Sequence, residues 1–408
     1  MLKAIKIQLY PNKTQEEYIG KLLGAYRFVY NNCLDKKIKS YKADKTNENL
    51  TTLGKYFHNE LLKNNDLIWL QEHNTKVLKQ SIINMLDAYN HFFKTKKGYP
   101  KFKSKHNNKL SCRFPVEAIS KRNDYSTNKL MITNNLKDVK FKCSDEYKNL
   151  LVKYKSGIKS ATLTKTKSGK YFLSILVDTI IEKQLKNSDD AIGIDLGIKD
   201  FVITSEGKTF KNLKLKTVNQ KKLAKLQRGL SRKKRGSKNR DKQRIKLAKF
   251  NEKLTNIKEN YLHSVANSLL NENQVIVMED LNVKGMMSNH NLARAVQELS
   301  LYRFKSILKY KAEWYGRVII EIDRFFPSSK LCNNCGNKKE DLKLSDRVYK
   351  CSCGYENDRD LNASLNILKE GLRIYNEQIP TRSGELTPLE SSGHTLVELG
   401  NKNLVNLS

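Results

Sequence analysis

The chain has 408 residues and a formal net charge of +35, from 77 Lys or Arg and 42 Asp or Glu residues. This length exceeds one simple core and suits two to four modules. Because so much positive charge is unfavourable in a compact state without a polyanion, nucleic acid is the expected partner. No apolar run approaches the roughly 20 residues that span a bilayer, and the N-terminus lacks the apolar core of a signal peptide. We therefore expect an intracellular, cytoplasmic protein that associates with the nucleoid and not with membranes.

The first part of the chain carries both strand and helix signals. Residues 2–10 alternate polar and apolar side chains, as a half-buried strand does. Thr14 and Glu17 then form a capping-box pattern, which predicts that a helix starts there. Apolar side chains at helical spacing predict a second helix over residues 75–93. The polar segment between these helices is rich in Lys and Asn and is expected to hold loops or short helices.

Strand signals dominate the stretch that follows, up to residue 182. Residues 130–133, 161–164 and 171–177 are rich in strand-forming side chains, and turn signals with glycine separate them. The pattern indicates a β-rich module with a helical insertion near its start.

A new unit begins near Asp190, where short apolar strands and long helices are expected. Residues 191–196 predict a buried strand, and 201–205 its hairpin partner. Residues 211–250 hold 17 Lys or Arg residues and one acid. Periodicity predicts five further elements, namely a helix over 254–269, a strand over 274–278, a helix over 301–315, a strand over 318–322 and a helix over 360–369.

Three carboxylates stand where these elements end or begin. Asp195 lies near the end of one apolar strand, Glu279 closes another, and Asp360 starts a helix. In open α/β sheets, sites form outside the carboxyl ends of the strands, so these side chains can converge. Hard oxygen ligands without histidine suit Mg²⁺ or Mn²⁺. Two such ions about 3.5–4 Å apart would activate water and stabilise the leaving oxygen of a phosphodiester, which predicts a metal-dependent nuclease.

Neighbouring acids offer alternatives to this assignment. Any one strand-end acid could be a solvated surface residue or a helix cap, and Asp200, Asp280 and Asp358 lie close to the three in sequence. Glu279 is preferred to Asp280 because it directly follows the apolar run.

Four of the seven cysteines form a cluster. Cys332 and Cys335 have the spacing of a zinc knuckle, and Cys351 and Cys353 follow after fifteen residues. In an extended segment, residues i and i+2 point the same way, so both thiolates of the second pair can reach one ion. Four thiolates complete a tetrahedral site without an open position, which predicts a structural zinc ribbon. The other cysteines are isolated and are expected to be ordinary thiols, at positions 33, 112 and 143.

Two basic segments are candidates for nucleic-acid contact. In the first, aromatic rings alternate with cations and could stack on bases, or the rings could instead anchor a loop in a core. In the second, a basic cluster within residues 211–250 is expected to meet phosphates, with plain solvated surface as the alternative. The candidate residues are Tyr99, Lys101, Phe102 and Lys103 in the first segment and Arg232, Lys233, Lys234 and Arg235 in the second.

Four distinct motifs lie in the second half of the chain. They are Gly-Ile-Asp-Leu-Gly-Ile-Lys-Asp-Phe at 193–201, Val-Met-Glu-Asp-Leu at 277–281, Phe-Pro-Ser-Ser-Lys-Leu-Cys-Asn-Asn-Cys-Gly at 326–336 and Asp-Arg-Asp-Leu-Asn-Ala-Ser at 358–364. Together they resemble the TnpB (OrfB) family of transposon-encoded proteins, which is related to type V CRISPR effectors. Less specific matches precede them, at residues 9–12, 24–27, 30–31 and 98–103.

The resemblance implies a multidomain fold that combines α+β and α/β architecture. A wedge-type β-barrel (1–17 and 95–185) would carry a helical recognition insertion (18–94). A RuvC-like nuclease domain of RNase H fold (186–327 and 354–375) would hold an inserted zinc ribbon that binds target nucleic acid (328–353). Residues 376–408 are expected to be a disordered tail.

Matching by motif position assigns roles to seven residues. Asp195, Glu279 and Asp360 match the catalytic Mg²⁺ or Mn²⁺ ligands, and the Asp-Arg-Asp match also favours Asp360 over Asp358. The four clustered cysteines match the zinc ligands, although Cys-x-Cys in the second pair departs from the commoner Cys-x-x-Cys.

The function implied by the resemblance is RNA-guided cutting of double-stranded DNA next to a short flanking motif. The guide RNA would be transcribed from the end of the insertion-sequence transposon that encodes the protein. Two other functions stay open, namely a transposase that acts directly on transposon DNA ends and a non-catalytic RNA-guided DNA-binding regulator. The three intact acids disfavour the regulator, and the sequence does not decide between monomer and dimer.

Overall fold

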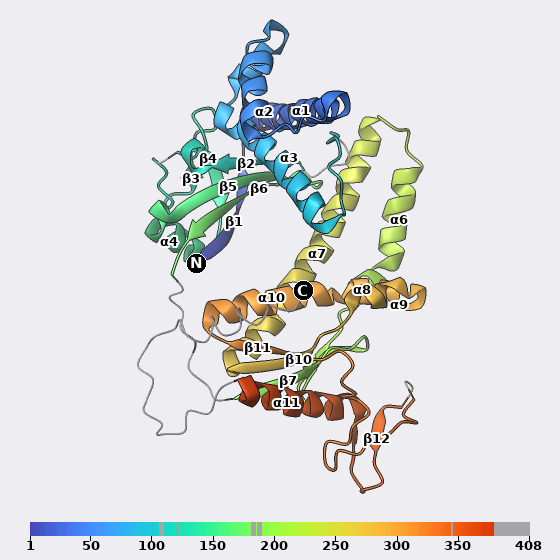
Figure 1. Cartoon of the computed structure of the whole chain (residues 1–408). Helices are drawn as coiled ribbons and strands as arrows, with labels where there is room; N and C mark the ends of the chain where they lie inside the picture. The colour runs from blue at the N-terminus through green and yellow to red at the C-terminus, as the bar shows by residue number, and fades with distance from the viewer. Residues whose placement is uncertain (106–109, 121, 181–184, 186–189, 344–345, 379–408) are drawn as a thin grey trace, which may run out of the picture. The chain divides into compact units, whose positions relative to one another are not determined.

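The computed structural model describes residues 1–105, 110–120, 122–180, 185, 190–343 and 346–378 (Figure 1). The expected tail lies outside these residues from position 379 onward. The chain forms two compact units, residues 1–180 and 181–408. In the part of the chain that is described, no helix is long and apolar enough to cross a membrane.

A long helix follows the first strand of the N-terminal unit. Strand β1 (Leu2–Tyr10) leads into α1 (Lys13–Asp44). The Asn12 side chain accepts a hydrogen bond from the Gln15 amide at 2.8 Å, and Gln15 Oε1 accepts one from the Asn12 amide at 2.9 Å. The helix start predicted at Thr14 is therefore wrong by two residues, because Asn is a stronger N-cap than Thr and takes that position first.

Short helices fill the polar segment after α1, as expected. They are α2 (Leu50–Tyr56), the π-helical turn η1 (Phe57–Leu61) and the 3₁₀ helix η2 (Asn65–Glu72). The helix predicted over 75–93 is confirmed as α3 (Thr75–Thr95). Helices α1 and α3 pack against each other and share one apolar core with the sheet of this unit.

The sheet of the N-terminal unit is antiparallel and has the strand order β2-β5-β6-β1-β4-β3. The predicted strands at 161–164 and 171–177 are confirmed, whereas only the start of the stretch 130–133 is part of a strand. Between the strands lie α4 (Asp145–Lys153), η3 (Val116–Ala118) and η4 (Lys155–Gly157). The strands are β1, β2 (Leu110–Pro115), β3 (Lys129–Leu130), β4 (Val139–Lys142), β5 (Ile158–Lys165) and β6 (Tyr171–Asp178).

This sheet is open in the residues that the structure describes. Strands β2 and β3 stand at its two ends, and they are not paired with each other there. Closure of the expected wedge-type barrel is therefore not found among the described residues. Strand β3 is only two residues long and offers too few backbone groups for a second ladder.

The C-terminal unit is built on a mixed sheet with the order β11-β10-β7-β8-β9. Strands β7 (Ala191–Asp195), β10 (Val275–Glu279) and β11 (Val318–Ile322) are parallel neighbours. Strands β8 (Asp200–Thr204) and β9 (Thr209–Lys211) extend the sheet by antiparallel pairing. The predicted strands and the predicted hairpin of this unit are thus confirmed.

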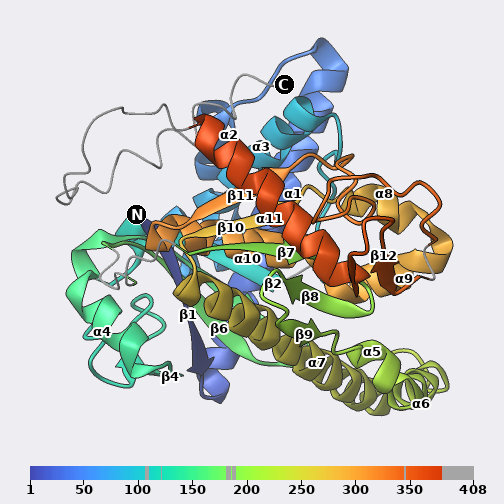
Figure 2. The ribbon, with the colours of Figure 1, turned by 90° about the horizontal axis from the view of Figure 1, so that it is seen from below.

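Helices cover both faces of this sheet (Figures 1 and 2). Helices α7 (Lys238–Glu272) and α10 (Leu301–Tyr315) bury apolar side chains on one face, together with Ile276 of β10. Helix α11 (Arg359–Gln378) covers the other face, where Val277 of β10 is buried. Neighbouring residues of β10 therefore serve opposite cores, as the alternation of a strand requires.

The helices differ from their predicted extents in two places. The helix predicted over 254–269 is the second part of the 35-residue helix α7, which already begins within the basic run. The helix predicted over 360–369 is confirmed but continues to residue 378. The remaining helices of this unit are α5 (Leu215–Val218), α6 (Gln220–Ser231), α8 (Val283–Ser288) and α9 (His290–Leu299).

Candidate active site and zinc centre

The structure places Asp195 and Glu279 side by side at the carboxyl ends of two neighbouring parallel strands. Asp195 is the last residue of β7 and Glu279 the last residue of β10. The two strands are parallel, with Met278 paired to Ile194, so the acids occupy the next position on each strand. Both carboxylates therefore stand at the carboxyl ends of neighbouring strands, where sites form in α/β sheets.

The third acid, Asp360, lies in the first turn of α11, close enough to Asp195 to raise its pKa. The helix packs directly on β7 because Gly193 has no side chain. A Cβ atom at Gly193 would lie 2.7 Å from the backbone nitrogen of Leu368. The Asp358 carboxylate accepts hydrogen bonds from the amides of Asp360 at 3.0 Å and Leu361 at 3.1 Å, so Asp358 caps the helix.

Electrostatics link the three acids. The pKa of Asp195 is raised to about 7, mainly by burial and in addition by the nearby carboxylates of Glu279 and Asp360, against the opposing effect of Arg359. Burial also raises the pKa of Glu279, and a hydrogen bond from Ser328 opposes that shift. Carboxyl groups that are buried next to one another favour a cation in their midst.

Asp280 is held apart from this group by two cations. Lys305 Nζ donates a hydrogen bond to Asp280 Oδ1 at 2.8 Å, and Arg324 pairs with Oδ2. The hydrogen bond from Lys305 is the main reason why the pKa of Asp280 lies below its usual range. Lys305 is shared with Glu321, at 3.0 Å. The charge of Asp280 is thus already balanced by the protein.

In the described residues, the set of three or more His, Cys, Asp or Glu side chains placed to hold one metal ion is the cysteine cluster, whose sulfur atoms all lie within 4.8 Å of one another. Asp195, Glu279 and Asp360 do not form such a set there.

The four cysteines have the geometry of a tetrahedral thiolate site. Sγ of Cys332 lies 3.7 Å from that of Cys353, and Sγ of Cys335 lies 3.6 Å from that of Cys351. A zinc ion with Zn–S bonds of about 2.3 Å separates its sulfurs by about 3.8 Å in a tetrahedron, so the residues fit zinc. The short hairpin of β12 (Val348–Lys350) and β13 (Glu356–Asp358) brings the second pair to the first.

Three polar residues that our sequence analysis did not assign connect the cysteine module to the acids. Ser328 donates a hydrogen bond to Glu279 Oε1. Nδ2 of Asn362 donates to the Leu331 carbonyl at 2.7 Å, and Nδ2 of Asn366 donates to the carbonyls of Leu331 and Ser328, both at 2.8 Å. Both Asn side chains are buried, one helical turn apart. Two asparagines at positions i and i+4 on the apolar face of a predicted helix could have indicated this connection, because buried amides need hydrogen-bond partners.

The aromatic and basic candidates of the N-terminal unit fall into two groups. The hydroxyl of Tyr99 lies 3.1 Å from that of Tyr89, and Lys103 Nζ lies 3.7 Å from the centroid of the Tyr30 ring. Burial lowers the pKa of Lys103 to about 8. Tyr99 and Lys103 thus make contacts within the unit, although Tyr99 is exposed as Lys101 and Phe102 are. Nucleic-acid contact by these residues stays a prediction.

The basic cluster of the C-terminal unit lies in the turn that joins α6 to α7. Its arginines and Lys234 are exposed, and Lys233 is half-buried. The guanidinium of Arg240 holds the turn, because Nη1 donates to the carbonyls of Leu230 at 2.8 Å and Lys233 at 3.0 Å. The exposed cations are accessible to phosphates, and their contact with nucleic acid also stays a prediction. They are Arg232, Lys234 and Arg235.

Three family models match separate parts of the chain. The model described as "Probable transposase" matches residues 173–290, and the model of the "Cas12f1-like, TNB domain" matches residues 302–367. A "Helix-turn-helix domain" model matches residues 1–46. In the structure these residues form one strand and one long helix, so that description does not fit the observed secondary structure.

Two similar proteins extend over nearly the whole chain. A protein of Streptomyces pristinaespiralis named "Putative RNA-guided DNA endonuclease" is 33% identical over 373 residues, which cover 91% of this chain and 89% of the relative. The "Putative RNA-guided DNA endonuclease InsQ" of Escherichia coli (strain K12) is 27% identical over 386 residues, covering 91% and 92% of the two chains.

A solved structure shares the fold. The chain of a Cas12f1–sgRNA–target DNA complex superposes with a TM-score of 0.56 and 14% sequence identity, covering 90% of this chain and 98% of that one. At this identity the likeness establishes the fold alone.

Proposed function

Since the chain belongs to the TnpB (OrfB) family of transposon-encoded proteins, we propose that it is an RNA-guided DNA endonuclease. It would bind a guide RNA from the transposon end and cut double-stranded target DNA next to a short flanking motif. The observation that carries the proposal is the meeting of Asp195, Glu279 and Asp360 from three separate elements. Three carboxylates this close together repel one another, which is unfavourable unless a cation joins them.

The donor set fits Mg²⁺ or Mn²⁺, because it consists of carboxylate oxygens and contains no thiol or imidazole. Asp195 carries the clearest sign of a missing positive charge, since its pKa is raised to about 7. When bound there, such ions would activate a water molecule and stabilise the leaving oxygen of the phosphodiester.

The surrounding residues prepare the acids for this task. Ser328 orients Glu279 by donating to one carboxylate oxygen, which leaves the other for a ligand. Lys305 and Arg324 neutralise Asp280, so this acid does not compete for the cation. The hydrogen bond from Ser328 holds the ligand Glu279 in place before substrate binds, which lowers the reorganisation needed for reaction.

The remaining charge of the protein suits the two polyanions of this reaction. A net charge of +35 favours binding of RNA and DNA backbones through the release of counterions. Within the proposal, base pairing with the guide reads the target, and the protein reads the flanking motif and the duplex shape. The finer division into wedge, recognition insertion, nuclease domain and ribbon is part of the proposal, with the boundaries given above.

The test uses the purified protein with its transposon-end RNA and a plasmid that carries a matched target beside a randomised flank. We expect cutting that needs both the RNA and Mg²⁺ and that selects a short flank. Asp195→Asn should abolish cutting, while Asp241→Asn, an exposed acid on α7, should not. Cutting by the Asp195→Asn protein would refute the assigned site, and cutting that ignores the RNA would refute RNA guidance.

The same experiment separates the two alternatives. A transposase that acts on DNA ends would join or cut transposon ends without a matched guide. DNA with transposon ends is therefore offered as a second substrate, because residues 173–290 match the "Probable transposase" model. A non-catalytic regulator would bind the target through the RNA but leave it intact.

A further inference from the structure

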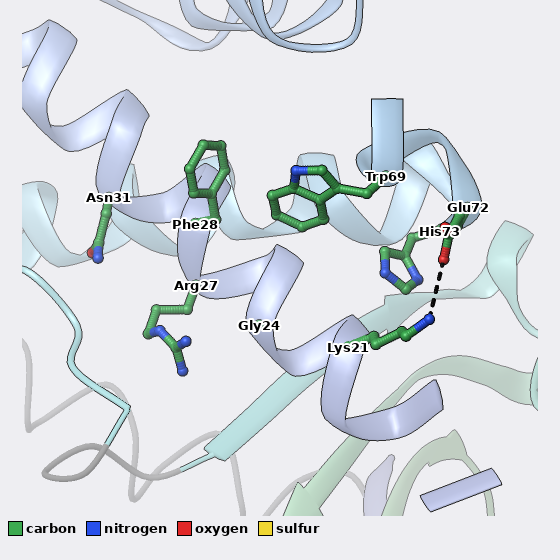
Figure 3. Close-up of a pocket in the computed structure, with 8 residues that line it drawn as sticks. All are labelled: Lys21, Gly24, Arg27, Phe28, Asn31, Trp69, Glu72 and His73. Carbon is green, nitrogen blue, oxygen red and sulfur yellow. Dashed lines mark ion pairs between the residues drawn. The ribbon is translucent and has the colours of Figure 1, made fainter. Parts of the chain in front are cut away.

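The N-terminal unit contains a pocket of about 480 Å³ that plays no part in the proposed nuclease chemistry (Figure 3). It lies between α1 and the segment of η2 that ends at His73. Pockets of this size hold small organic ligands. Its lining combines cationic side chains with aromatic rings, which come from both α1 and η2.

One wall is a single face of α1. Lys21, Gly24, Arg27 and Asn31 line the pocket at spacings of three or four residues, which places them in one row along the helix. Gly24 opens the middle of this row, because a Cβ atom there would meet no other atom within 4 Å. A flat ligand can therefore approach the backbone of α1 at Gly24.

The opposite wall offers a ring for stacking. Trp69 projects from η2 toward α1 in Figure 3, and its ring packs edge-on against Phe28 with centroids 5.2 Å apart. Both side chains are only half-buried. Aromatic rings held in this manner bind the faces of nucleobases at little entropic cost.

The pocket also holds a cation, Arg27, for which the described residues offer no partner. Arg27 is half-buried, and no hydrogen bond or ion pair of its side chain is found among the described residues. Lys21 reaches Glu72 at 3.8 Å, but both side chains are mostly exposed, so this pair is weak. An anionic group would complete the arrangement at Arg27.

His73, which also lines the pocket, has a buried polar atom without a partner in the described residues. The side chain is only 4% exposed, and its Nδ1 atom is buried without a hydrogen-bond partner in the described part of the chain. Burial also lowers the pKa of His73, which disfavours the charged form of the ring. A buried polar atom without a partner is rare in a completed site.

We propose that this pocket binds one unstacked nucleotide of a single strand, with its base against Trp69 over Gly24 and its phosphate at Arg27. The chemistry is that of a nucleotide, which a loop of the guide RNA or an unwound DNA strand could supply. The proposal rests on the proposed function only for the source of that strand. The pocket itself does not require the nuclease reaction.

Tryptophan fluorescence tests the pocket in the full-length protein. The chain has two Trp residues, so Trp314→Phe leaves Trp69 as the only reporter. Asp195→Asn in the same protein prevents cutting of the probe. We expect 5′-phosphorylated tetranucleotides, offered once as an RNA probe and once as a DNA probe, to change the Trp69 emission in a saturable manner. A preference for the RNA probe would assign the pocket to the guide, and a preference for the DNA probe would assign it to a DNA strand. No saturable change with either probe would overturn the proposal.

A pair of glycine variants separates pocket binding from general attraction to a basic protein. Gly24→Leu fills the pocket, whereas Gly20→Leu places the same side chain on the exposed surface of α1. A Cβ atom meets no other atom within 4 Å at either position, and leucine favours helix over glycine, so both variants should fold. We expect Gly24→Leu to weaken binding about tenfold, as when a base loses its stacking partner, and Gly20→Leu to leave it unchanged. Equal affinities of the two variants would refute the pocket.

A third variant examines the phosphate. Arg27→Gln should weaken binding of both probes and reduce the slope of log affinity against log salt by about one unit. An unchanged slope would place the phosphate elsewhere and overturn this assignment. Because these readouts need no cutting, binding in the pocket by a protein that never cuts would contradict the proposed function alone. Cutting without pocket binding would contradict this inference alone.

Discussion

The hydroxyl of Ser328 donates a hydrogen bond to Oε1 of Glu279, 49 residues earlier in the chain. The Ser328 carbonyl in turn accepts a hydrogen bond from Asn366 Nδ2 of α11 at 2.8 Å. One serine therefore connects the end of β10, the entry to the cysteine module and the helix that carries Asp360. Residues that orient ligands in this way are often as important for a metal site as the ligands themselves.

Replacing this serine should weaken the metal site without unfolding the protein. In Ser328→Ala, Glu279 loses the hydrogen bond that opposes the rise of its pKa, so the carboxylate holds a cation less well. We expect cutting to fall by about 10- to 100-fold and to need more Mg²⁺. The measurement is the initial rate of plasmid cutting as a function of Mg²⁺ concentration.

The adjacent serine is a matched control. Ser329 is half-buried, and no hydrogen bond of its side chain is found in the described residues. Ser329→Ala should therefore follow the wild-type Mg²⁺ dependence. If Ser328→Ala did so as well, the hydrogen bond to Glu279 would have no functional weight.

The metal-free protein should lose stability as the pH rises from about 4 to 7, because Asp195 is buried without a cation. Its pKa in the folded state is about 7, above its ordinary value of 3.8. The folded state thus binds this proton more tightly than the unfolded state, and the advantage is lost as the pH rises through this window. Asp195→Asn removes the ionisation and should be more stable than wild type at pH 8, by at most about 4 kcal/mol.

Melting temperatures at pH 5 and pH 8 provide the measurement. Wild type should melt lower at pH 8 relative to Asp195→Asn, and added Mg²⁺ should remove most of this difference. Asp241→Asn, which changes an exposed acid paired with Arg244, should show the wild-type pH dependence. Identical pH profiles for Asp195→Asn and wild type would mean that Asp195 ionises without penalty.

The contact between α11 and β7 should depend on the missing side chain of Gly193. A Cβ atom there would lie 2.7 Å from the backbone nitrogen of Leu368, and backbone cannot move aside cheaply. Gly193→Ala should therefore shift α11 and destabilise the protein by about 2–4 kcal/mol. At a permissive temperature, cutting should fall because Asp360 moves with the helix.

Gly229→Ala is the control for this substitution, within the same unit. Its Cβ atom would meet the end of the flexible Gln243 side chain, at 3.0 Å, and moving that end away costs at most its hydrogen bond to the Leu226 carbonyl. Because Ala favours the helix over Gly, we expect unchanged or slightly raised stability. A melting temperature of Gly193→Ala equal to that of Gly229→Ala would show that α11 tolerates displacement from β7.

The strand ends that carry two of the acids could be predicted because their signals are local. An apolar run followed by Asp195, and another followed by Glu279, fix each position within a few residues. Parallel pairing of β7 with β10 then brings the acids together without further instruction. The choice of Glu279 over Asp280 rested on the end of an apolar run, and in the structure Asp280 is paired with cations.

The features that sequence analysis missed depend on contacts between distant residues. The hydrogen bond of Ser328 to Glu279 has no local pattern, because any serine can donate. Whether a sheet closes into a barrel likewise depends on contacts between its end strands, and strand β3, which was predicted to be longer, has only two residues. The start of α1 was misplaced for a local reason, since the capping strength of Asn12 was not weighed against that of Thr14.

Loss of zinc should reduce cutting even though the cysteines lie outside the acidic site. The ion would hold the segment that begins at Cys332, next to the Leu331 carbonyl that accepts hydrogen bonds from Asn362 and Asn366. Without it, the ribbon loosens, and with it the segment that presents Ser328 to Glu279. We expect Cys335→Ser to lose zinc in a metal-release assay and to cut at least about tenfold more slowly at saturating Mg²⁺, because Ser328 is no longer held against Glu279.

Cys143→Ser, which changes an isolated thiol of the N-terminal unit, should retain both zinc and activity. A zinc-free protein that cuts at the wild-type rate would show that the acids hold their geometry without the ribbon.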